Sequence, residues 1–597
     1  MCKKITGNLR SKLNAVVFIL VIIIAAALGL TSFRMVDELP ATSPPDTFSA
    51  ERAFSHIEVI SKHPHPIGGD TISSVRTYIK EEIIKLGLAP VTQNTTVPDY
   101  FYLNKGNPVD IQNIYTVIPG KDPTGSIILA GHYDTVPVSP GANDNSSAVA
   151  TLIETTRALL ASPQQDNDVI ILFTDAEEPG QFRYGARYFV EHFNTIEDVF
   201  VVLNFEALGR TGPSIMFETA PGNRWLIEAL AKNAPTPVAF SFMSDLYRSI
   251  AAGGTDFVAF EEKGINGLNF AYSFERTGYH TALDNIDSVD LRSLQHHGEY
   301  ALNLTRYFGN YIVADHPENN TPDSVYHSLF GRFILRYPTS WVLPITALCT
   351  LVLVLLLFVA FKKKKITMRQ ILISFFFSFG ELLSITIVTT LLWWGIDELN
   401  MAIGFVVDPG LKSHVFFIGF LLLTMAIMMT ARLYLKNRLS SFAANAGSAF
   451  VFLVIAILAA IFVPGFNIIF VWPLLLSCIP LFLMINDKSM SSITWSHKGL
   501  LLSGTLISVI LLTVPIYLLF QGIGTASPGF SGSPSFPIIG LSIIFWAFLL
   551  WILLPVSEFF MNWKNRKIIA GLSILALLLI IIGFILPGIA IGDFGLF

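Results

Sequence analysis

Histidine and carboxylate side chains stand close together at several points in the first half of this 597-residue chain. They gather in blocks such as GHYD at 131–134, DAEE at 175–178 and NFEA at 204–207. Several negative groups in one water-poor cleft repel one another unless a cation offsets them. Imidazole nitrogen with carboxylate oxygen is a donor set that suits zinc well, without excluding manganese or cobalt. If these blocks meet in the folded chain, the chemistry they predict is that of a divalent metal.

Short apolar runs lead into these blocks, and amphipathic segments separate the runs. We predict strands at 112–118, 126–134, 168–178 and 199–207, with helices at 147–161 and 185–193. This alternation indicates an α/β domain with a mostly parallel (mixed) sheet flanked by helices. Sites in such sheets lie beyond the carboxyl ends of the strands. The side chains that we expect on one rim are His132, Asp134, Asp144, Asp175, Glu177, Glu178 and Glu206.

Five blocks follow one another between residues 131 and 285. They are GHYD (131–134), GANDNSSA (141–148), DAEE (175–178), NFEALG (204–209) and GYHTALDN (278–285). This ordered set resembles the M28 family of di-zinc aminopeptidases, and HPHPIGG at 63–69 fits the membrane-bound branch of that family. The resemblance implies a di-zinc aminopeptidase-like (phosphorylase/hydrolase-like) fold for the domain that carries the blocks.

Carried over position by position, the resemblance implies two Zn²⁺ ions in this domain. The ligands it implies are His132 and Glu206 for one ion and Glu178 and His280 for the other, with Asp144 bridging both. Glu177 would be the general base, and Asp134 would orient His132. The classical soluble members usually have Asp where this chain has Glu206, a longer side chain that can still reach a metal.

Further polar residues are candidates for the same cleft. A donor that stabilises the tetrahedral oxyanion is expected, and Tyr247, Tyr272 and Tyr279 are equally eligible. Asp256 and Arg248 could line the substrate cleft, although a loop turn or a salt bridge explains either residue equally well.

The composition excludes an ordinary soluble globule, because 52% of the residues are hydrophobic, 14% are charged and the mean hydropathy is +0.57. About nine apolar runs are near the length that crosses a bilayer. They lie near 13–33, 342–361, 371–395, 414–434, 446–463, 467–485, 499–520, 537–556 and 568–590. Within the third run, Glu381 is a functional candidate by its position. Because no opposite charge lies near it in the pattern, we expect a protonated Glu381 bonded to a neighbouring helix.

The runs divide the chain into a soluble part and a membrane part. We predict a cytoplasmic N-terminus at 1–12, a transmembrane signal anchor at 13–33, an extracytoplasmic or lumenal peptidase domain at 34–340 and a membrane domain of about eight helices at 341–597. Lys and Arg concentrate before the first run and in alternate loops such as 362–365, which places those segments in the cytoplasm. The first run could instead be a cleaved signal peptide.

We therefore predict a multi-pass membrane protein that hydrolyses peptide bonds as a zinc-dependent exopeptidase of the aminopeptidase type, with a metal-activated water. A bacterial cell membrane, a vacuole or an endoplasmic reticulum would satisfy this topology. The expected partners are peptide substrates and the lipid bilayer, and the net charge of −5 offers no basic surface for nucleic acid. Two alternatives stay open: a glutaminyl-cyclase-like mono-zinc acyltransferase of the same fold, and a non-catalytic receptor or transporter. The sequence leaves the oligomeric state open.

Overall fold

The computed structural model describes residues 2–590 except 99–106, 180–181, 251–253, 313–320, 407–409, 436–437, 490–491, 523–538 and 562–565. Its contacts divide the chain into two compact units. One contains Phe33–Thr339, and the other combines Met1–Ser32 with Ser340–Thr525 and Phe536–Ile591. We call them the α/β unit and the helical unit and describe each by itself.

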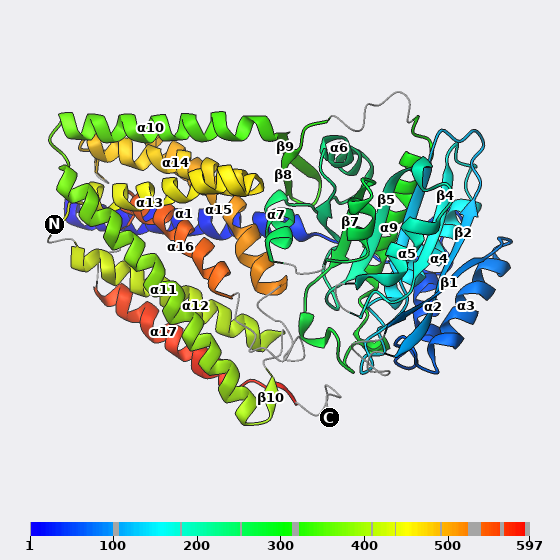
Figure 1. Ribbon diagram of the computed structural model, residues 1–597. Coiled ribbons are helices and arrows are strands. Elements are labelled where there is room, and N and C mark those ends of the chain that lie inside the picture. The colour runs from blue at the N-terminus through cyan, green and yellow to red at the C-terminus, as the bar shows by residue number, and fades with distance from the viewer. Residues whose placement is uncertain are drawn as a thin grey trace. The chain divides into compact units, whose positions relative to one another are not determined.

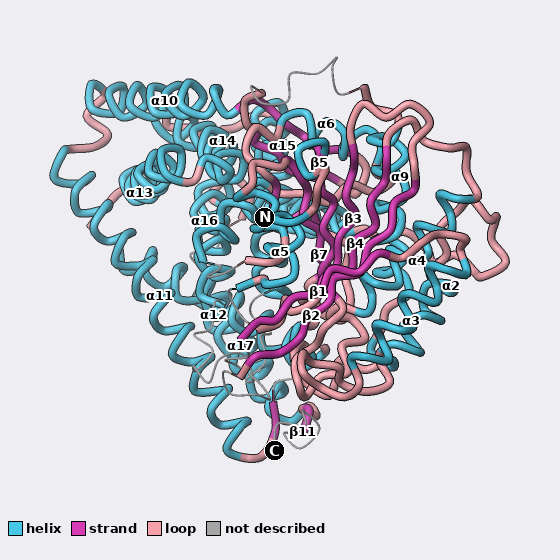
Figure 2. Tube along the Cα trace, turned by 45° about the vertical axis from the view of Figure 1, so that its right-hand side comes forward, coloured by secondary structure: helices cyan, strands magenta, loops and turns pink. Residues whose placement is uncertain are grey.

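A seven-stranded sheet forms the centre of the α/β unit, with the strand order β1-β2-β4-β3-β5-β7-β6 (Figure 2). The strands are β1 (Val91–Pro98), β2 (Pro108–Ile118), β3 (Ser126–His132), β4 (Asp168–Thr174), β5 (Val199–Ala207), β6 (Ile215–Thr219) and β7 (Asn266–Tyr272). The four neighbours β4, β3, β5 and β7 run parallel, and β1, β2 and β6 join antiparallel at the two sides. The prediction of a mostly parallel, mixed sheet is confirmed.

The central strands are buried on both faces because helices cover both. Ile127 and Leu129 of β3 belong to one hydrophobic core, whereas Ile128 and Ala130 belong to the other. Alternate side chains of a strand point to opposite faces, so an uninterrupted apolar run serves two cores at once. This is why β3 and β5 consist almost entirely of apolar residues until they reach their carboxyl ends.

Helices α4 (Ser146–Leu160), α2 (Ala50–Ile60) and α9 (Leu291–Gly309) pack together on the first core (Figure 1). Helices α5 (Tyr184–His192) and α8 (Phe257–Glu262) pack together on the second. The α/β unit also contains α3 (Ile72–Lys85), α6 (Arg224–Asn233), α7 (Ser241–Ile250) and a hairpin of β8 (Ser324–Leu329) and β9 (Phe333–Pro338). The alternating pattern predicted β2 to β5, α4 and α5, but not β7, the parallel neighbour of β5.

The helical unit consists of long apolar helices. They are α1 (Cys2–Leu30), α10 (Val342–Lys362), α11 (Met368–Ala402), α12 (Leu411–Leu435), α13 (Ser441–Phe462), α14 (Asn467–Ile485), α15 (Trp495–Gly522), α16 (Ile539–Ser557) and α17 (Arg566–Ile585). Two-residue strands β10 (Phe405–Val406) and β11 (Ile589–Ala590) pair beside them. Among the described residues, eight helices are long and apolar enough to span a membrane, and Leu541–Ser557 is a shorter apolar segment. The number of membrane passes stays a prediction.

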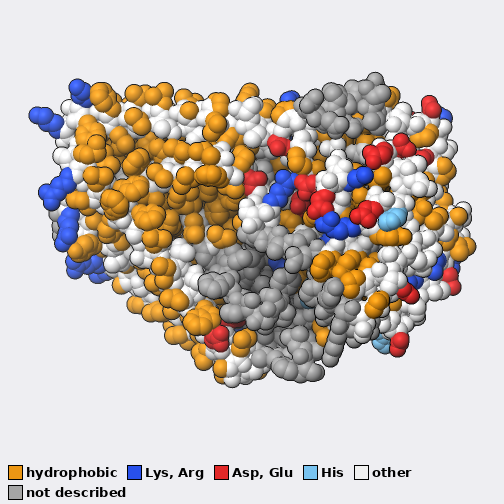
Figure 3. Space-filling view, in the orientation of Figure 1, with side chains coloured by type: hydrophobic (Ala, Val, Ile, Leu, Met, Phe, Trp, Pro, Cys, Tyr) orange, Lys and Arg blue, Asp and Glu red, His pale blue; other side chains and the backbone are white. Residues whose placement is uncertain are grey.

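The surface of the helical unit differs from that of a soluble protein. Hydrophobic side chains cover most of the visible face of the bundle, and Lys and Arg side chains gather at one end (Figure 3). The loop between α10 and α11 lies at that end, with Lys362, Lys363 and Lys364 exposed, and α1 begins there as well (Figure 1). This separation of apolar and basic side chains is the pattern expected for helices surrounded by lipid.

One contact in this unit was not indicated by the sequence pattern. Glu381 of α11 does have an opposite charge beside it, because Arg432 of α12 places its Nη2 atom 3.7 Å from Glu381 Oε2. The two residues are 51 positions apart in the chain, so no local pattern could reveal the pair. The expected bond to a neighbouring helix is present, since Trp551 Nε1 of α16 donates to Glu381 Oε2 at 3.1 Å.

Candidate metal centre

The predicted rim lies at the carboxyl ends of the parallel strands. β3 ends at His132, β4 is followed by the 175–178 block, and Glu206 is the penultimate residue of β5. Since β3 pairs in parallel with both β4 and β5, these ends meet at one edge of the sheet. β7 runs parallel to β5 and leads through the 273–279 segment to His280, which brings that histidine to the same edge.

Five of the predicted residues bring their donor atoms together in two groups. His132, Asp144 and Glu206 form one group, and Asp144, Glu178 and His280 form the other; within each, one donor atom per residue lies within 4.8 Å of the rest. The groups share Asp144. Its Oδ1 atom is 3.4 Å from His132 Nε2, and its Oδ2 atom is 3.1 Å from His280 Nε2.

The other two ligand candidates complete the groups symmetrically. Glu206 Oε2 lies 3.4 Å from His132 Nε2, and Glu178 Oε2 lies 3.1 Å from His280 Nε2. Each histidine thus faces the shared aspartate and one glutamate. An arrangement in which one carboxylate presents an oxygen to each of two imidazoles is suited to two neighbouring cations.

Asp134 lies behind this centre. Its Oδ1 atom is 3.5 Å from His132 Nδ1, while the backbone carbonyl of Asp134 is closer to the same nitrogen, at 3.1 Å. The Asp134 carboxylate also accepts the backbone N–H groups of Glu177 and Glu178 at 3.0 and 3.1 Å. This single buried side chain therefore links the end of β3 to the loop that carries both glutamates.

Glu177 is buried next to the donor groups and has a cationic neighbour. The structure places Glu177 with His132 and Glu178 in a third group of donor atoms within 4.8 Å of one another. Arg183 Nε is 3.0 Å from Glu177 Oε1, and Arg183 Nη1 donates to the backbone carbonyl of Glu177 at 3.1 Å. No sequence pattern pointed to Arg183, which follows the DAEE block by five residues.

Backbone strain marks the same loops. Ala176 and His280 have φ angles of 60° and 58°, in the left-handed region that non-glycine residues rarely adopt. Ala176 separates Asp175 from the two glutamates, so its conformation turns Asp175 away from them. Asp175 instead accepts hydrogen bonds from Arg76 and Tyr133, at 2.5 and 2.7 Å. The expectation that Asp175 joins the rim chemistry is therefore not met. Such strain is typical of functional sites.

Amide side chains orient Glu206. Asn204 Nδ2 donates to Glu206 Oε1 at 2.9 Å, and Asn145 Nδ2 lies 3.2 Å from Glu206 Oε2. Asn204 also contacts Asn269 of β7, which donates to Glu218 of β6 at 2.9 Å. This buried chain of polar side chains crosses three adjacent strands and ends at Glu206. Glu206 is the position at which the classical soluble members of the resembled family usually have the shorter Asp.

Asp284 fixes the loop that carries Asp144. Its carboxylate accepts the backbone N–H groups of Asn143 and Asp144 at 2.8 and 3.0 Å, and the Asn143 side chain at 2.8 Å. The Tyr272 hydroxyl donates to Asn143 Oδ1 at 2.9 Å, so it supports the same loop. Asp284 was not among the predicted site residues, although the GYHTALDN block contains it.

The remaining candidates lie in different surroundings. The Tyr279 ring stacks on His280 with centroids 3.9 Å apart, whereas Tyr247 contacts Phe217 edge-on at 4.7 Å. Arg248 forms a salt bridge with Glu261 at 2.8 Å, which is the structural alternative considered for it. Asp256 is fully buried and accepts a hydrogen bond from Thr174, the last residue of β4.

The electrostatics of the centre call for positive charge. Burial raises the pKa of Glu178 to about 7 and that of Glu177 well above its usual value. Burial alone would lower the pKa of His280, but Glu178 and Asp144 raise it to about 10. His132 behaves in the same way, since contacts with three carboxylates overcome its burial and raise its pKa. Divalent cations would supply this positive charge and leave the imidazoles neutral, so the donor set fits a metal centre.

His and carboxylate donors grouped at the carboxyl ends of parallel strands of an α/β domain form a candidate site for divalent metal ions. Residues 113–305 match the model of "Peptidase family M28". The matched segment carries all seven predicted site residues, so the similarity to this family that the sequence indicated is confirmed for this part of the chain.

Two curated relatives are membrane-associated by name. The chain is 31% identical over 225 residues to the "Putative endoplasmic reticulum metallopeptidase 1-A" of Caenorhabditis elegans, a match that covers 37% of this chain and 25% of the relative. It is 30% identical over 383 residues to the "Vacuolar membrane protease" of Candida albicans, covering 62% of this chain and 42% of the relative. The matches thus span between a quarter and about two fifths of these relatives. With its apolar helices, the chain is a membrane protein.

Solved structures with similar chain traces cover less than half of this chain. The zinc aminopeptidase BSAP from Bacillus subtilis aligns with 18% identity and a TM-score of 0.34, covering 46% of this chain and 96% of that chain. The glutaminyl cyclase of Porphyromonas gingivalis aligns with 19% identity and a TM-score of 0.35, covering 44% and 99%.

Proposed function

We propose that this protein is a membrane-anchored, zinc-dependent aminopeptidase that hydrolyses peptides on the non-cytoplasmic side of its membrane. The observation that carries the proposal is the pair of donor groups joined through Asp144. A single metal site needs only one such group, and the second group supports a centre of two ions. Peptide substrates and the lipid bilayer are the partners that this function requires.

Zinc fits the donor set, and each residue has a role in holding it. His132 and Glu206 would hold one ion, His280 and Glu178 the other, and Asp144 would contribute one oxygen to each. A pair of zinc ions supplies Lewis-acid polarisation of a peptide carbonyl and lowers the pKa of water towards neutrality. Asn204 and Asn145 would keep the Glu206 carboxylate in its orientation, since each donates to a different oxygen.

In this proposal Glu177 transfers the proton. Its carboxylate lies within reach of both donor groups, so it can accept a proton from the attacking water and deliver it to the departing amine. Arg183 contacts the same carboxylate at 3.0 Å and limits its rotation. Asp134 holds the backbone of Glu177 in place and faces the outer nitrogen of His132. Tyr279, next to His280, is the candidate nearest in sequence to the centre for stabilising the oxyanion.

The proposed preference of the enzyme for peptides with a free N-terminus rests on the charges of the peptide and of the candidate metal centre. A peptide's terminal ammonium group carries a positive charge, and the centre contains four carboxylates within three overlapping groups of donor atoms. The side of the membrane follows from the Lys and Arg bias of the loops, which places 1–12 and 362–365 in the cytoplasm and the α/β unit opposite.

Metal removal provides the direct test. The purified full-length protein should cleave aminoacyl fluorogenic substrates, lose that activity in a chelator and regain it when zinc is added back. Elemental analysis of the same sample should find about two zinc ions per chain. One ion per chain with cyclisation of N-terminal glutamine would instead favour the glutaminyl-cyclase-like alternative. A metal-loaded protein that cleaves no N-terminal residue would overturn the proposal in favour of a receptor or transporter.

The orientation of Glu206 can be tested separately. Replacing Asn204 by Ala removes the donor to Glu206 Oε1 and should weaken zinc binding about 10- to 100-fold, the effect usual for a group that orients a metal ligand. Competition with a zinc-responsive dye measures this without any assay of activity. Asn233→Ala is the matched control, because Asn233 lies on α6 and its side chain contacts only the Ala229 carbonyl among the bonds described. Equal zinc affinity in the two variants would contradict the role given to Asn204.

A further inference from the structure

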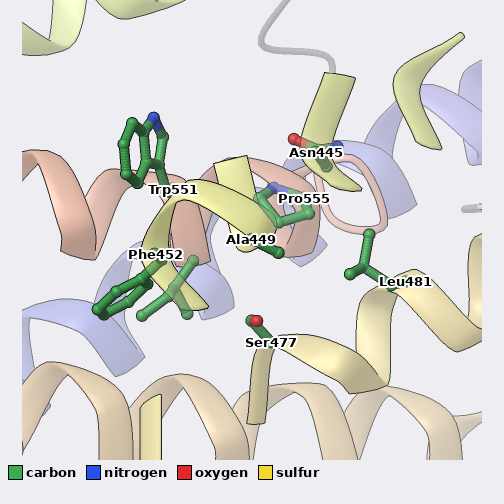
Figure 4. Close-up of a pocket in the computed structure, with 8 residues that line it drawn as sticks. Asn445, Ala449, Phe452, Ser477, Leu481, Trp551 and Pro555 are labelled. Carbon is green, nitrogen blue, oxygen red and sulfur yellow. The ribbon is translucent and has the colours of Figure 1, made fainter. Parts of the chain in front are cut away.

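Both units bury polar side chains. In the helical unit, Trp551, which donates to Glu381, also lines a small pocket between α13, α14 and α16 (Figure 4). Asn445 and Ser477 add polar groups to its wall, but the pocket has room for about one water molecule. In the α/β unit, by contrast, buried polar side chains form a chain that ends at the candidate metal centre, so their arrangement affects the chemistry there.

Three strands place the members of this chain side by side. β7 lies between β5 and β6 in the sheet, and Asn269 of β7 is the register partner of both Asn204 of β5 and Glu218 of β6. Glu206 follows Asn204 by two positions on β5, so the two side chains point to the same face of the sheet. Asn204 and Asn269 are fully buried, and Glu218 and Glu206 are each 3% exposed. The four side chains therefore bond to one another and to the protein rather than to solvent.

A β-bulge brings Glu218 into this row. The register of the β6–β7 pair shifts between Met216 and Glu218. Phe217 is the extra residue, so Glu218 rather than Phe217 lies opposite Asn269. A shift of one residue reverses the face to which a side chain points, so without the bulge Glu218 would point away from the chain. Bulges beside functional sites commonly redirect a side chain in this way.

Hydrogen bonds connect the four side chains in one direction. Asn269 Nδ2 donates to Glu218 Oε2 at 2.9 Å, and Asn269 Oδ1 accepts from Asn204 Nδ2 at 3.0 Å. Asn204 Nδ2 also donates to Glu206 Oε1 at 2.9 Å. Asn269 Nδ2 makes a further bond to Thr255 Oγ1 at 2.8 Å, so both N–H groups of each amide are used.

The two amides do not set this direction by themselves. Within the described part of the chain, Asn204 Oδ1 is buried and has no hydrogen-bond partner. A reversed arrangement, in which Asn269 Nδ2 donates to Asn204 Oδ1, would satisfy that oxygen. It would also turn amide oxygens towards the carboxylates of Glu218 and Glu206. An ionised carboxylate only accepts hydrogen bonds, so the carboxylates at the two ends exclude the reversed arrangement.

We propose that Glu218 is a positioning residue of the candidate metal centre. By accepting from Asn269 it holds the Asn269 oxygen towards Asn204, and Asn204 then directs an N–H group at Glu206. The inference rests on the proposed function, because that function makes Glu206 a zinc ligand. A glutamate has one more rotatable bond than an aspartate, and the chain restricts Glu206 to one orientation before an ion binds.

The protonation state of Glu218 sets the pH of the test. Burial raises the pKa of Glu218 to about 7, although the hydrogen bond from Asn269 lowers it. Among the charged neighbours, Glu261 and Glu206 raise this pKa and Arg248 lowers it. Measurements at pH 8 therefore keep most of the Glu218 carboxyl groups ionised.

Zinc binding by Glu218→Gln provides the test, measured on the purified full-length protein by competition with a zinc-responsive dye at pH 8. Gln has the shape of Glu but can donate to Asn269, so the chain can reverse and turn an oxygen towards Glu206. We expect the affinity for one zinc ion to fall about three- to tenfold, less than the 10- to 100-fold typical of a group that contacts a metal ligand directly. The affinity for the ion assigned to Glu178 and His280 should not change, because these residues lie outside the chain.

A double-mutant cycle separates positioning from a loss of stability. In the Asn204→Ala background, Glu218→Gln should have no further effect on zinc affinity, because Asn204 is the link through which Glu218 acts. Additive losses would contradict that link. Glu154→Gln is the matched control, since Glu154 is a carboxylate of α4 that is 1% exposed and pairs with Arg52 and Arg157. Equal losses of zinc affinity in Glu154→Gln and Glu218→Gln would refute the proposal.

Failure of this inference can be told apart from failure of the proposed function. If the parent binds two zinc ions and Glu218→Gln leaves both affinities unchanged, or weakens both equally, the positioning role is wrong and the proposed function is unaffected. If the parent binds no zinc, both are wrong. If Glu218→Gln does not fold, Asn269→Ala breaks the same chain at its middle and should weaken the same single ion.

Discussion

Replacing Glu177 by Gln should lower kcat/KM for aminoacyl substrates by about 10²- to 10⁴-fold, the usual contribution of a general base. Gln keeps the shape and the hydrogen-bonding length of Glu177 but cannot take a proton from water. Zinc content should stay at the level of the parent, because Glu177 is not one of the five proposed ligands. Steady-state kinetics together with elemental analysis of the same preparation measures both quantities.

The control for this variant lies on the next helix. Glu191 is an exposed residue of α5, so Glu191→Gln changes the net charge by the same amount without touching the centre. Activity in Glu191→Gln should match the parent. If Glu177→Gln retained activity within a few-fold of the parent, another group would have to move the proton and the assignment of Glu177 would be wrong.

Replacing Asp144 by Asn should have the second large effect, on both metal content and activity. Asp144 is the shared member of the two donor groups, with one oxygen 3.4 Å from His132 and the other 3.1 Å from His280. Asn presents one oxygen and one N–H donor, so it cannot offer an anionic oxygen to both sides. We expect zinc to fall from about two ions per chain to below one, with loss of measurable hydrolysis.

Asp122→Asn is the matched substitution, because Asp122 is exposed in the loop that follows β2. It should retain the zinc and the activity of the parent. If Asp144→Asn instead bound one ion at full occupancy and stayed active, the two donor groups would act separately. That result would support a mono-zinc enzyme. The two variants differ only in whether the lost carboxylate lies in the centre.

Much of the candidate site could be predicted because its His and carboxylate side chains lie where the apolar strands end. The run that ends at His132 and the run that ends at Glu206 are buried on both faces, so their polar ends had to emerge at the sheet edge. The ordered blocks added His280, which no periodicity indicates. All five proposed ligands do lie together, although their roles at the metal stay predictions.

The supporting contacts could not be predicted in the same way. Asp284 holds the Asp144 loop across 140 positions, and Asn145 reaches Glu206 across 61. Arg183 approaches Glu177 because its backbone takes a left-handed conformation with φ of 48°. Such contacts depend on how loops turn and pack, and loop conformation leaves no regular spacing in the chain.

The sequence by itself determined the two-part organisation, the mixed sheet and the set of residues at its edge, because hydrophobic periodicity and burial are local properties of the chain. Only the tertiary structure decided that Asp144 faces both histidines and that Asp175 turns away from them. It also decided that Arg432 lies beside Glu381 within the helical unit. Each of these depends on which distant segments pack against one another, and that pairing is set by the whole fold rather than by any single stretch.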